Sequence, residues 1–131
     1  MANLLIDTQV FVWLTNDDKR LGKITLQKLS DTANRVCISY FSFFEMTIKA
    51  SVGKLNYDIS VLGDLTKMGI DLIMPDEEAL RGYAIFNPDN KDPFDNVLIA
   101  VARNEKCTFV TSDPKILSVS APGFKLFGAT R

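Results

Sequence analysis

The sequence predicts a single α/β domain in which a central, mostly parallel sheet is flanked by helices on both faces. Short apolar runs alternate with segments of helical periodicity along the whole chain, which is the order expected of β-α-β units. These runs are almost continuously apolar, as strands buried on both faces are. The 131 residues show no repeat, low-complexity tract or linker, so residues 1–131 are expected to share one core.

The first half of the chain is expected to contain two strands and four helical segments. Glycines follow two of the helices, because glycine readily adopts the backbone conformation that ends a helix. In order, the predicted elements are a strand at 4–6, a buried helix at 10–14, an exposed helix at 21–33, a strand at 36–39, a helix at 40–52 before Gly53, and a helical segment at 61–68 before Gly69.

The second half continues the alternation with three strands and three helices. Two of its helices begin with an Asp-Pro pair, in which the aspartate caps the helix and the proline suits its first position. The predicted elements are a strand at 72–74 stopped by Pro75, a helix from Asp76 to about residue 86, a polar loop at 87–91, a helix beginning at Asp92-Pro93, a strand at 108–111, a short helix from Asp113-Pro114 to 117, and a strand at 124–127.

The composition excludes several kinds of enzyme. The chain has no histidine, which rules out Ser-His-Asp and Cys-His nucleophiles, histidine acid–base chemistry and histidine-containing zinc sites. A formal net charge of −1 argues against a protein that wraps nucleic acid by bulk electrostatics.

Cys37 and Cys107 lack CxxC spacing and are expected to be buried, reduced thiols. With no evident signal peptide or membrane span, a cytoplasmic protein is expected.

Acidic residues follow the predicted strands repeatedly. Asp7 and Asp113 come just after two of them, and Glu45 lies in the second turn of the helix after a third. Asp92 and Asp95 open the helix that precedes the strand ending before Asp113. Ligand sites of parallel sheets lie outside the carboxyl ends of the strands. We therefore expect these acids to converge on one edge of the sheet.

Simpler interpretations exist for each acid taken singly. Asp7, Asp92 and Asp113 all suit the capping position of a helix, and Asp95 suits the positive end of the helix dipole. Glu45 is harder to explain, because its neighbours are mainly Phe, Met and Ile. An ion pair with Lys49 four residues later is one alternative, but it contributes only about 0.2–0.5 kcal/mol.

A metal ion explains the acids as a group. Several carboxylates within a few ångströms repel one another and raise each other's pKa values, unless a divalent cation neutralises them. Oxygen ligands without His or Cys select Mg²⁺ or Mn²⁺ over Zn²⁺. Such clusters suit metal-assisted hydrolysis of phosphodiester bonds, a reaction that needs no histidine.

Four segments resemble the PIN-domain family, and specifically the VapC-type toxin ribonucleases. They occur in the family's order and span most of the chain. The segments are LIDT at 5–8, SYFSFFEMTIKASVGKL at 39–55, KDPFDNVLIAVA at 91–102 and TFVTSD at 108–113.

The resemblance implies a magnesium-dependent endoribonuclease, with Mn²⁺ as a substitute, that acts as the toxin of a VapBC-like toxin–antitoxin system. Its metal-binding catalytic acids map onto Asp7, Glu45, Asp95 and Asp113. A VapB-type antitoxin is the implied partner, with its tail in the acidic crevice, and homodimerisation is also implied. The supporting residues are Asp92, as a cap or outer support, and Thr8, Ser42 and Thr111, which steady the site.

RNA contacts are less clear from the sequence. Lys49 and Lys91 are the best candidates because they flank Glu45 and Asp92, although most lysines are simply solvated. The chain departs from the family at Gln9 and Phe44, where relatives often carry His and Trp, and in residues 88–91, which lack the histidines common there. These differences affect substrate contacts and no metal ligand.

The family's strand order also bears on the cysteines. It places the first strand between those that carry Cys37 and Cys107, about 9.6 Å apart, which is too far for a disulfide.

Two other functions remain open. A phosphatase of the haloacid-dehalogenase type or a receiver domain would also place an acid after the first strand. The former needs Asp-x-Asp, however, and position 9 is Gln, while the latter usually has paired acids there. The third hypothesis is a PIN-like fold that has lost catalysis and only binds RNA or protein. Retention of all four acids argues against it.

Overall fold

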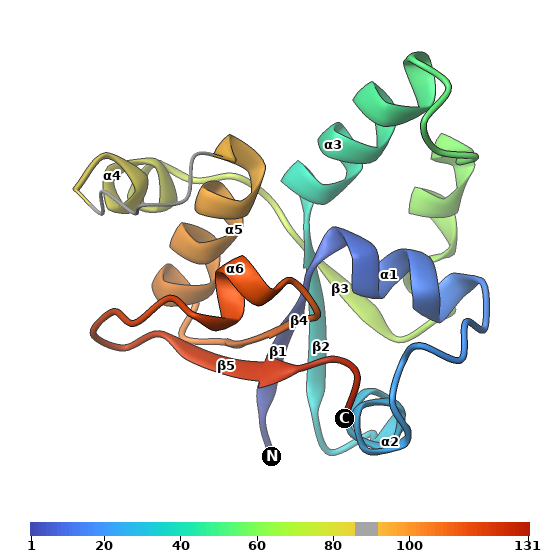
Figure 1. Ribbon diagram of the computed structural model, residues 1–131, viewed down its shortest axis with the longest axis horizontal. Helices are drawn as coiled ribbons and strands as arrows, with labels where there is room; N and C mark the ends of the chain where they lie inside the picture. Colours follow the sequence, from blue (N-terminus) through green and yellow to red (C-terminus); the bar gives the residue numbers. More distant parts are fainter. Residues whose placement is uncertain (86–91) are drawn as a thin grey trace.

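The computed structural model describes residues 1–85 and 92–131, the latter group beginning just before α5. Five strands alternate with helices, as Figure 1 shows. Their bounds are β1 (Asn3–Ile6), α1 (Thr8–Thr15), α2 (Lys23–Ser30), β2 (Arg35–Ser39), α3 (Tyr40–Ser51), the 3₁₀ helix η1 (Ile59–Asp64), β3 (Ile70–Ile73), α4 (Glu77–Ile85), α5 (Pro93–Asn104), β4 (Thr108–Thr111), α6 (Pro114–Leu117) and β5 (Lys125–Gly128).

The strands form one sheet in the order β3-β2-β1-β4-β5, and every neighbouring pair is parallel. The predicted α/β fold with a parallel sheet flanked by helices is therefore confirmed. In register, Leu5 of β1 lies between Cys37 of β2 and Phe109 of β4. Cys37 and Cys107 are both buried and free, as predicted. Because the strands are parallel, their carboxyl ends meet at the same edge of the sheet.

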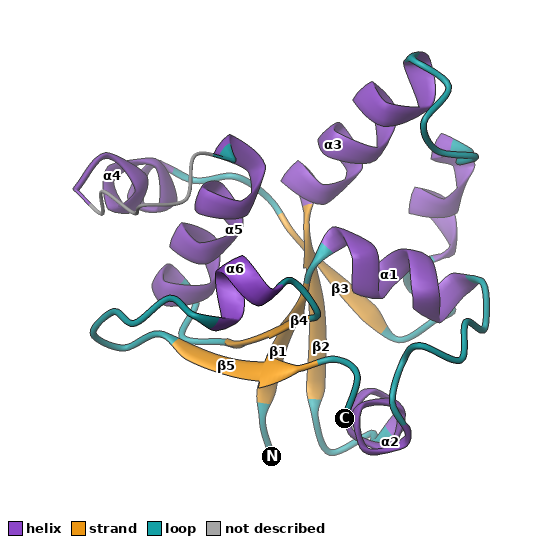
Figure 2. Ribbon diagram, in the orientation of Figure 1, coloured by secondary structure: helices purple, strands orange, loops and turns teal. Residues whose placement is uncertain are grey.

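Successive residues of the central strand face opposite layers of helices. Leu4 and Ile6 belong to one core cluster, and Leu5 belongs to the other. The first cluster packs under α1 and α3, and the second packs under α4, α5 and α6, the two groups of helices that Figure 2 shows on either side of the sheet. This double coverage explains why the strands are apolar at nearly every position.

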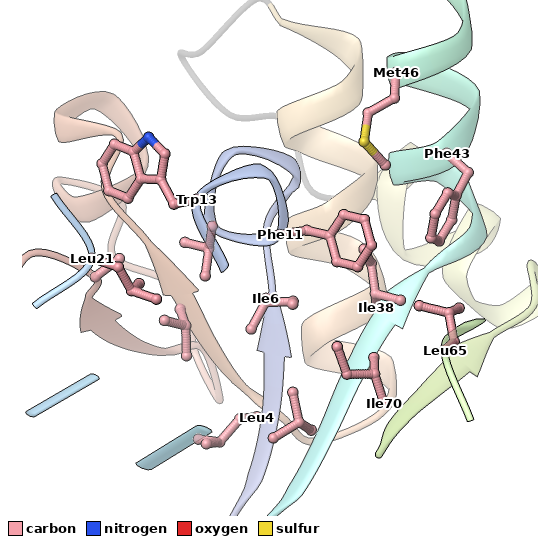
Figure 3. Close-up of a cluster of buried hydrophobic side chains, with 14 residues drawn as sticks. Leu4, Ile6, Phe11, Trp13, Leu21, Ile38, Phe43, Met46, Leu65 and Ile70 are labelled. Atoms are coloured by element: carbon pink, nitrogen blue, oxygen red, sulfur yellow. The ribbon is translucent and has the colours of Figure 1, made fainter. Parts of the chain in front are cut away.

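The first cluster contains a contact between two aromatic rings, one from α1 and one from α3. Figure 3 shows Phe11 of α1 beside Phe43 and Met46 of α3, above Ile38 of β2. The rings of Phe11 and Phe43 lie edge to face, with 5.4 Å between centroids. Such contacts are geometrically specific, so they fix α1 and α3 relative to each other.

Two helical predictions need correction. The segment predicted as a helix at 61–68 is instead the 3₁₀ helix η1, capped by the Asp58 side chain, followed by turns up to Gly69. Gly63 in the middle of η1 lowers helix propensity, which limits its length. The helix predicted at 21–33 is the shorter α2. The predicted polar loop at 87–91 and the helix end at residue 86 lie outside the described residues.

The start of α2 is held against the end of the chain. The backbone N–H of Gly22 donates to the carbonyl of Ala129 at 2.9 Å, and that of Thr25 donates to the carbonyl of Arg131 at 3.1 Å. A Cβ on Gly22 would lie 1.8 Å from the Arg131 carbonyl oxygen, so only glycine fits at position 22.

Candidate metal centre

An acidic cleft of about 460 Å³ opens at the carboxyl ends of the central strands. Figure 1 shows α1, α3 and α6 beginning close together at this end of the sheet. Five carboxylates of the described residues line the cleft, and they come from separate parts of the chain. Its full lining is Asp7, Thr8, Gln9, Val12, Trp13, Glu45, Lys49, Lys54, Leu55, Asp92, Asp95, Leu98, Ser112, Asp113 and Pro114.

Asp7 lies at the floor of the cleft, only 6% exposed. It caps α1, because its Oδ1 accepts from the backbone N–H of Val10 at 2.7 Å, and its Oδ2 accepts from the hydroxyl of Thr111. Burial, with a smaller contribution from the negative charges of Asp95 and Glu45, raises its pKa from 3.8 to about 6, although these two hydrogen bonds act to lower it. Asp7 is thus both a cap and a carboxylate with a strongly perturbed pKa, which is typical of a functional site.

Glu45 is buried, and both of its carboxylate oxygens have partners. Its Oε1 accepts from the hydroxyl of Thr8 at 2.7 Å, and its Oε2 lies 2.8 Å from Nζ of Lys49. The i,i+4 ion pair considered as an alternative is therefore present, and Glu45 nevertheless lines the cleft. The hydrogen bond from Lys49 to Glu45 raises the pKa of that lysine, and the charges of Asp92 and Asp95 add to the effect.

Two other acids are helix caps, as their Asp-Pro pairs predict. Asp92 caps α5, because its Oδ1 accepts from the N–H of Phe94 at 2.9 Å and of Asp95 at 3.3 Å. Asp113 caps α6 by accepting from the N–H of Lys115 at 2.9 Å. Asp95 lies in the first turn of α5, where its charge suits the helix dipole. All three carboxylates still line the acidic cleft.

The remaining predicted residues divide into three groups. Thr8 lines the cleft, and Thr111 lies beneath it in contact with Asp7. Ser42 is fully buried, does not line the cleft, and its hydroxyl has no hydrogen-bond partner within the described parts of the chain. Lys91 lies outside the described residues. Ser112 was missed, although its place between a strand end and the cap Asp113 could have indicated it.

The donor set suits a hard divalent cation by type, since it consists of carboxylate oxygens without histidine or cysteine. Within residues 1–85 and 92–131, however, no three acidic side chains are close enough together to hold a metal ion. One reason is visible at Glu45, whose outer oxygen is paired with Lys49. The cleft therefore collects suitable donors without arranging them as a coordination shell.

The family of the chain follows from a comparison with protein-family profiles. The PIN domain profile matches residues 4–122, nearly the whole sheet and every element of the acidic cleft. The chain belongs to the PIN domain family. The predicted PIN-domain membership is thus confirmed, and because PIN domains are nucleases, it supports a hydrolase that cleaves nucleic acid. The curated proteins include no match to this chain.

Solved structures with the same fold include toxin–antitoxin complexes. A chain of VapBC2 from Rickettsia felis, bound to a DNA fragment from its promoter, matches with a TM-score of 0.70 and 17% identity, covering 96% of this chain and 98% of that one. A chain of VapBC-1 from nontypeable Haemophilus influenzae matches with a TM-score of 0.64 and 17% identity, covering 98% of this chain and 99% of that one. A chain of DNA-bound VapBC from Salmonella typhimurium matches with a TM-score of 0.66 and 15% identity, covering 98% of each chain. At these identities the likeness shows the fold.

The described helices include none that is both long and apolar enough to span a membrane.

Proposed function

We propose that this PIN domain is a Mg²⁺- or Mn²⁺-dependent endoribonuclease and the toxin of a VapBC-like toxin–antitoxin pair. One observation carries the proposal: acids from four separate segments line a single cleft at the carboxyl edge of the sheet. Capping alone does not explain this, because Glu45 caps no helix and is nevertheless directed into the cleft.

Asp7, Glu45, Asp95 and Asp113 are the residues that would hold the ion. A bound divalent ion supplies activation of water and neutralisation of the phosphate charge. The chain orients the carboxylates through Thr111 on Asp7 and Thr8 on Glu45. These two hydrogen bonds hold Asp7 and Glu45 in place, while binding of an ion would still require the carboxylates to draw closer together.

Asp92 supports the site by fixing the start of α5, which carries Asp95. Ser42 is the least supported of the expected helpers, because its hydroxyl lies outside the cleft lining. For RNA, the proposed contacts are Lys49, which lines the cleft, and Lys91. A lysine at the cleft wall offers a positive charge to the RNA backbone.

The proposed partner is a VapB-type antitoxin, and the named complexes of similar fold support it. The five carboxylates of the cleft suit a basic side chain on the antitoxin tail. In keeping with such a system, we place the protein in the cytoplasm.

We also propose a homodimer, supported by an apolar stripe on α3. Tyr40, Phe44 and Ile48 follow each other at i,i+4 spacing and are 40%, 55% and 42% exposed, and Val52 extends the stripe at 62%. Burial of such a stripe against a second copy would remove apolar surface from water. Ile48→Glu should shift the protein to the monomer in light scattering, while a dimer that persists unchanged would exclude this face.

The function is tested by incubating the protein with total RNA in Mg²⁺ or Mn²⁺ and sequencing the new RNA ends. Asp7→Ala and Asp95→Asn should abolish cleavage while circular dichroism shows a folded protein, and chelator should stop the wild type. Asp71→Asn is the matched control, because this exposed carboxylate pairs with Arg35 on β2, away from the cleft. Full cleavage by both cleft variants would refute the proposal.

The same preparations separate the other functions. A domain that only binds RNA would show no carboxylate-dependent binding of Mn²⁺ in calorimetry. A phosphatase would instead trap phosphate on Asp7.

A further inference from the structure

A positive charge of the chain itself already occupies part of the acidic cleft. Nζ of Lys49 lies 2.8 Å from Oε2 of Glu45, and the negative charges of Asp92 and Asp95 also stabilise the charged form of the lysine. The two partners differ in burial, since the side chain of Glu45 is 9% exposed and that of Lys49 is 50% exposed. The ammonium therefore reaches in from the rim to a carboxylate that is fixed inside.

We infer that Lys49 is a tethered counter-cation, which a divalent ion must displace from Glu45, so that this lysine sets the metal affinity of the cleft. The inference rests on the proposed metal role of Glu45. It adds a residue that acts through a ligand, and we call Lys49 a positioning residue for that reason.

The competition follows from the geometry of Glu45. Its Oε1 accepts a hydrogen bond from the Thr8 hydroxyl and its Oε2 is paired with the ammonium of Lys49, so a metal ion that binds at Oε2 competes with that ammonium. The side-chain amine of lysine in its charged form has no lone pair to offer a metal ion. The ammonium therefore cannot join the ion as a ligand, and a cation bound at Oε2 would repel it at close range, which favours its departure.

The lysine is free to leave without disturbing the fold. Lys49 lies in the last turn of α3, and its half-exposed side chain can swing into solvent on four rotatable bonds. A deeply buried lysine would lose far more on separation, because an unpaired buried charge is strongly unfavourable. Displacement consequently costs about as much as breaking a partly exposed ion pair, which corresponds to at most about fivefold in affinity.

Lys54 provides a matched control. It lines the same cleft and carries the same charge, but within the described residues it forms no ion pair with an acid. Removing either lysine takes one positive charge from the cleft, and only the change at position 49 frees Glu45. A difference in Mn²⁺ affinity between the two variants therefore reports the effect of the Lys49–Glu45 ion pair, because the change in net charge is the same in both.

The experiment is a calorimetric titration of metal-free protein with Mn²⁺ at pH 7.5 and low salt. Lys49→Met should bind Mn²⁺ more tightly than the wild type by up to about fivefold, Lys54→Met should change by less, and Lys49→Arg should restore the weaker affinity. In chelator, Lys49→Met should melt about 2–4 °C lower, since its Glu45 loses the internal cation.

The outcomes distinguish this inference from the proposed function. Suppose that Mn²⁺ binds the wild type, that Asp95→Asn abolishes this binding, and that Lys49→Met binds Mn²⁺ no more tightly than the wild type. The role of Lys49 is then overturned, and the proposed metal site is retained. Equal tightening in both lysine variants overturns it too, because net charge would then explain the effect. If Mn²⁺ binds none of the proteins, both the inference and the proposed metal site fail.

Discussion

The hydroxyl of Thr111 donates a hydrogen bond to Oδ2 of Asp7, joining the ends of β4 and β1 across 104 positions of sequence. The same hydroxyl accepts from the backbone N–H of Asp113 at 3.1 Å. One buried side chain therefore orients one proposed metal ligand and positions the segment that carries another. Neither bond could be formed by an apolar residue of the same shape.

Thr111→Val should destabilise the protein and raise the pKa of Asp7. The hydrogen bond from Thr111 favours the charged carboxylate and lowers that pKa, so its loss leaves Asp7 with less compensation for burial. We expect a loss of about 1–3 kcal/mol in urea unfolding at pH 7.5. Mn²⁺ binding should also begin at a higher pH. Thr111→Ser keeps the hydroxyl and should retain most of both properties, and a Val variant indistinguishable from wild type would contradict this role.

Asp7→Asn should make the metal-free protein more stable at neutral pH. The folded pKa of about 6 exceeds the ordinary 3.8, so the folded state holds the proton more tightly than the unfolded state. Stability from this group is therefore complete below about pH 4 and is lost as the pH rises through 6. The uncharged Asn avoids that loss, which at pH 7.5 amounts to about 3 kcal/mol at most.

The measurement is urea unfolding in chelator between pH 4 and 8. The gain of Asp7→Asn over wild type should be absent at pH 4 and grow up to about pH 7. A gain that is the same at every pH would show that the carboxyl proton is not its cause. Asp71→Asn, which changes an exposed carboxylate, is the control for general charge effects.

Asp92 should act as a cap and not as a ligand. Asp92→Ala removes the acceptor for the N–H groups of Phe94 and Asp95 and should lower stability by about 1 kcal/mol. Asp92→Ser keeps a capping oxygen and should keep both the stability and the Mn²⁺ affinity within about twofold. A large loss of Mn²⁺ affinity in the folded Ser variant would instead make Asp92 a ligand.

Gly22→Ala should be among the more damaging single-methyl changes in the chain. The new Cβ would overlap the carbonyl of Arg131, so either α2 or the end of the chain must move. We expect a loss of about 1–3 kcal/mol in thermal or urea unfolding. Gly63→Ala is the matched control, because a Cβ there meets nothing within 4 Å and should be neutral or slightly stabilising.

The sequence predicts the sheet and the caps well because both depend on local signals. Runs such as 4–6 are apolar on both faces, and the Asp-Pro pairs at 92 and 113 mark helix starts through the chemistry of two adjacent residues. The prediction of a helix at 61–68 is wrong because the spacing of apolar residues does not account for Asp58, which caps the segment, or for Gly63, which limits its length.

Contacts between residues that are far apart in the chain could not be predicted from the sequence alone. The fit of Gly22 against Arg131 depends on how α2 and the last strand meet, and no local pattern encodes it. The sequence offered two roles for Glu45, the ion pair and the cleft. The structure shows that one side chain fills both, since the pair itself lies in the cleft.

The strand order has a consequence for the time at which activity can arise. β1 is made first yet lies at the centre of the sheet, and its second neighbour, β4, is made only after residue 107. Asp7 therefore lacks the Thr111 hydroxyl, and the cleft lacks the wall that carries Asp113, until most of the chain exists. The acidic cleft is consequently among the last features of the fold that a growing chain can complete, because its residues come from both ends of the sequence.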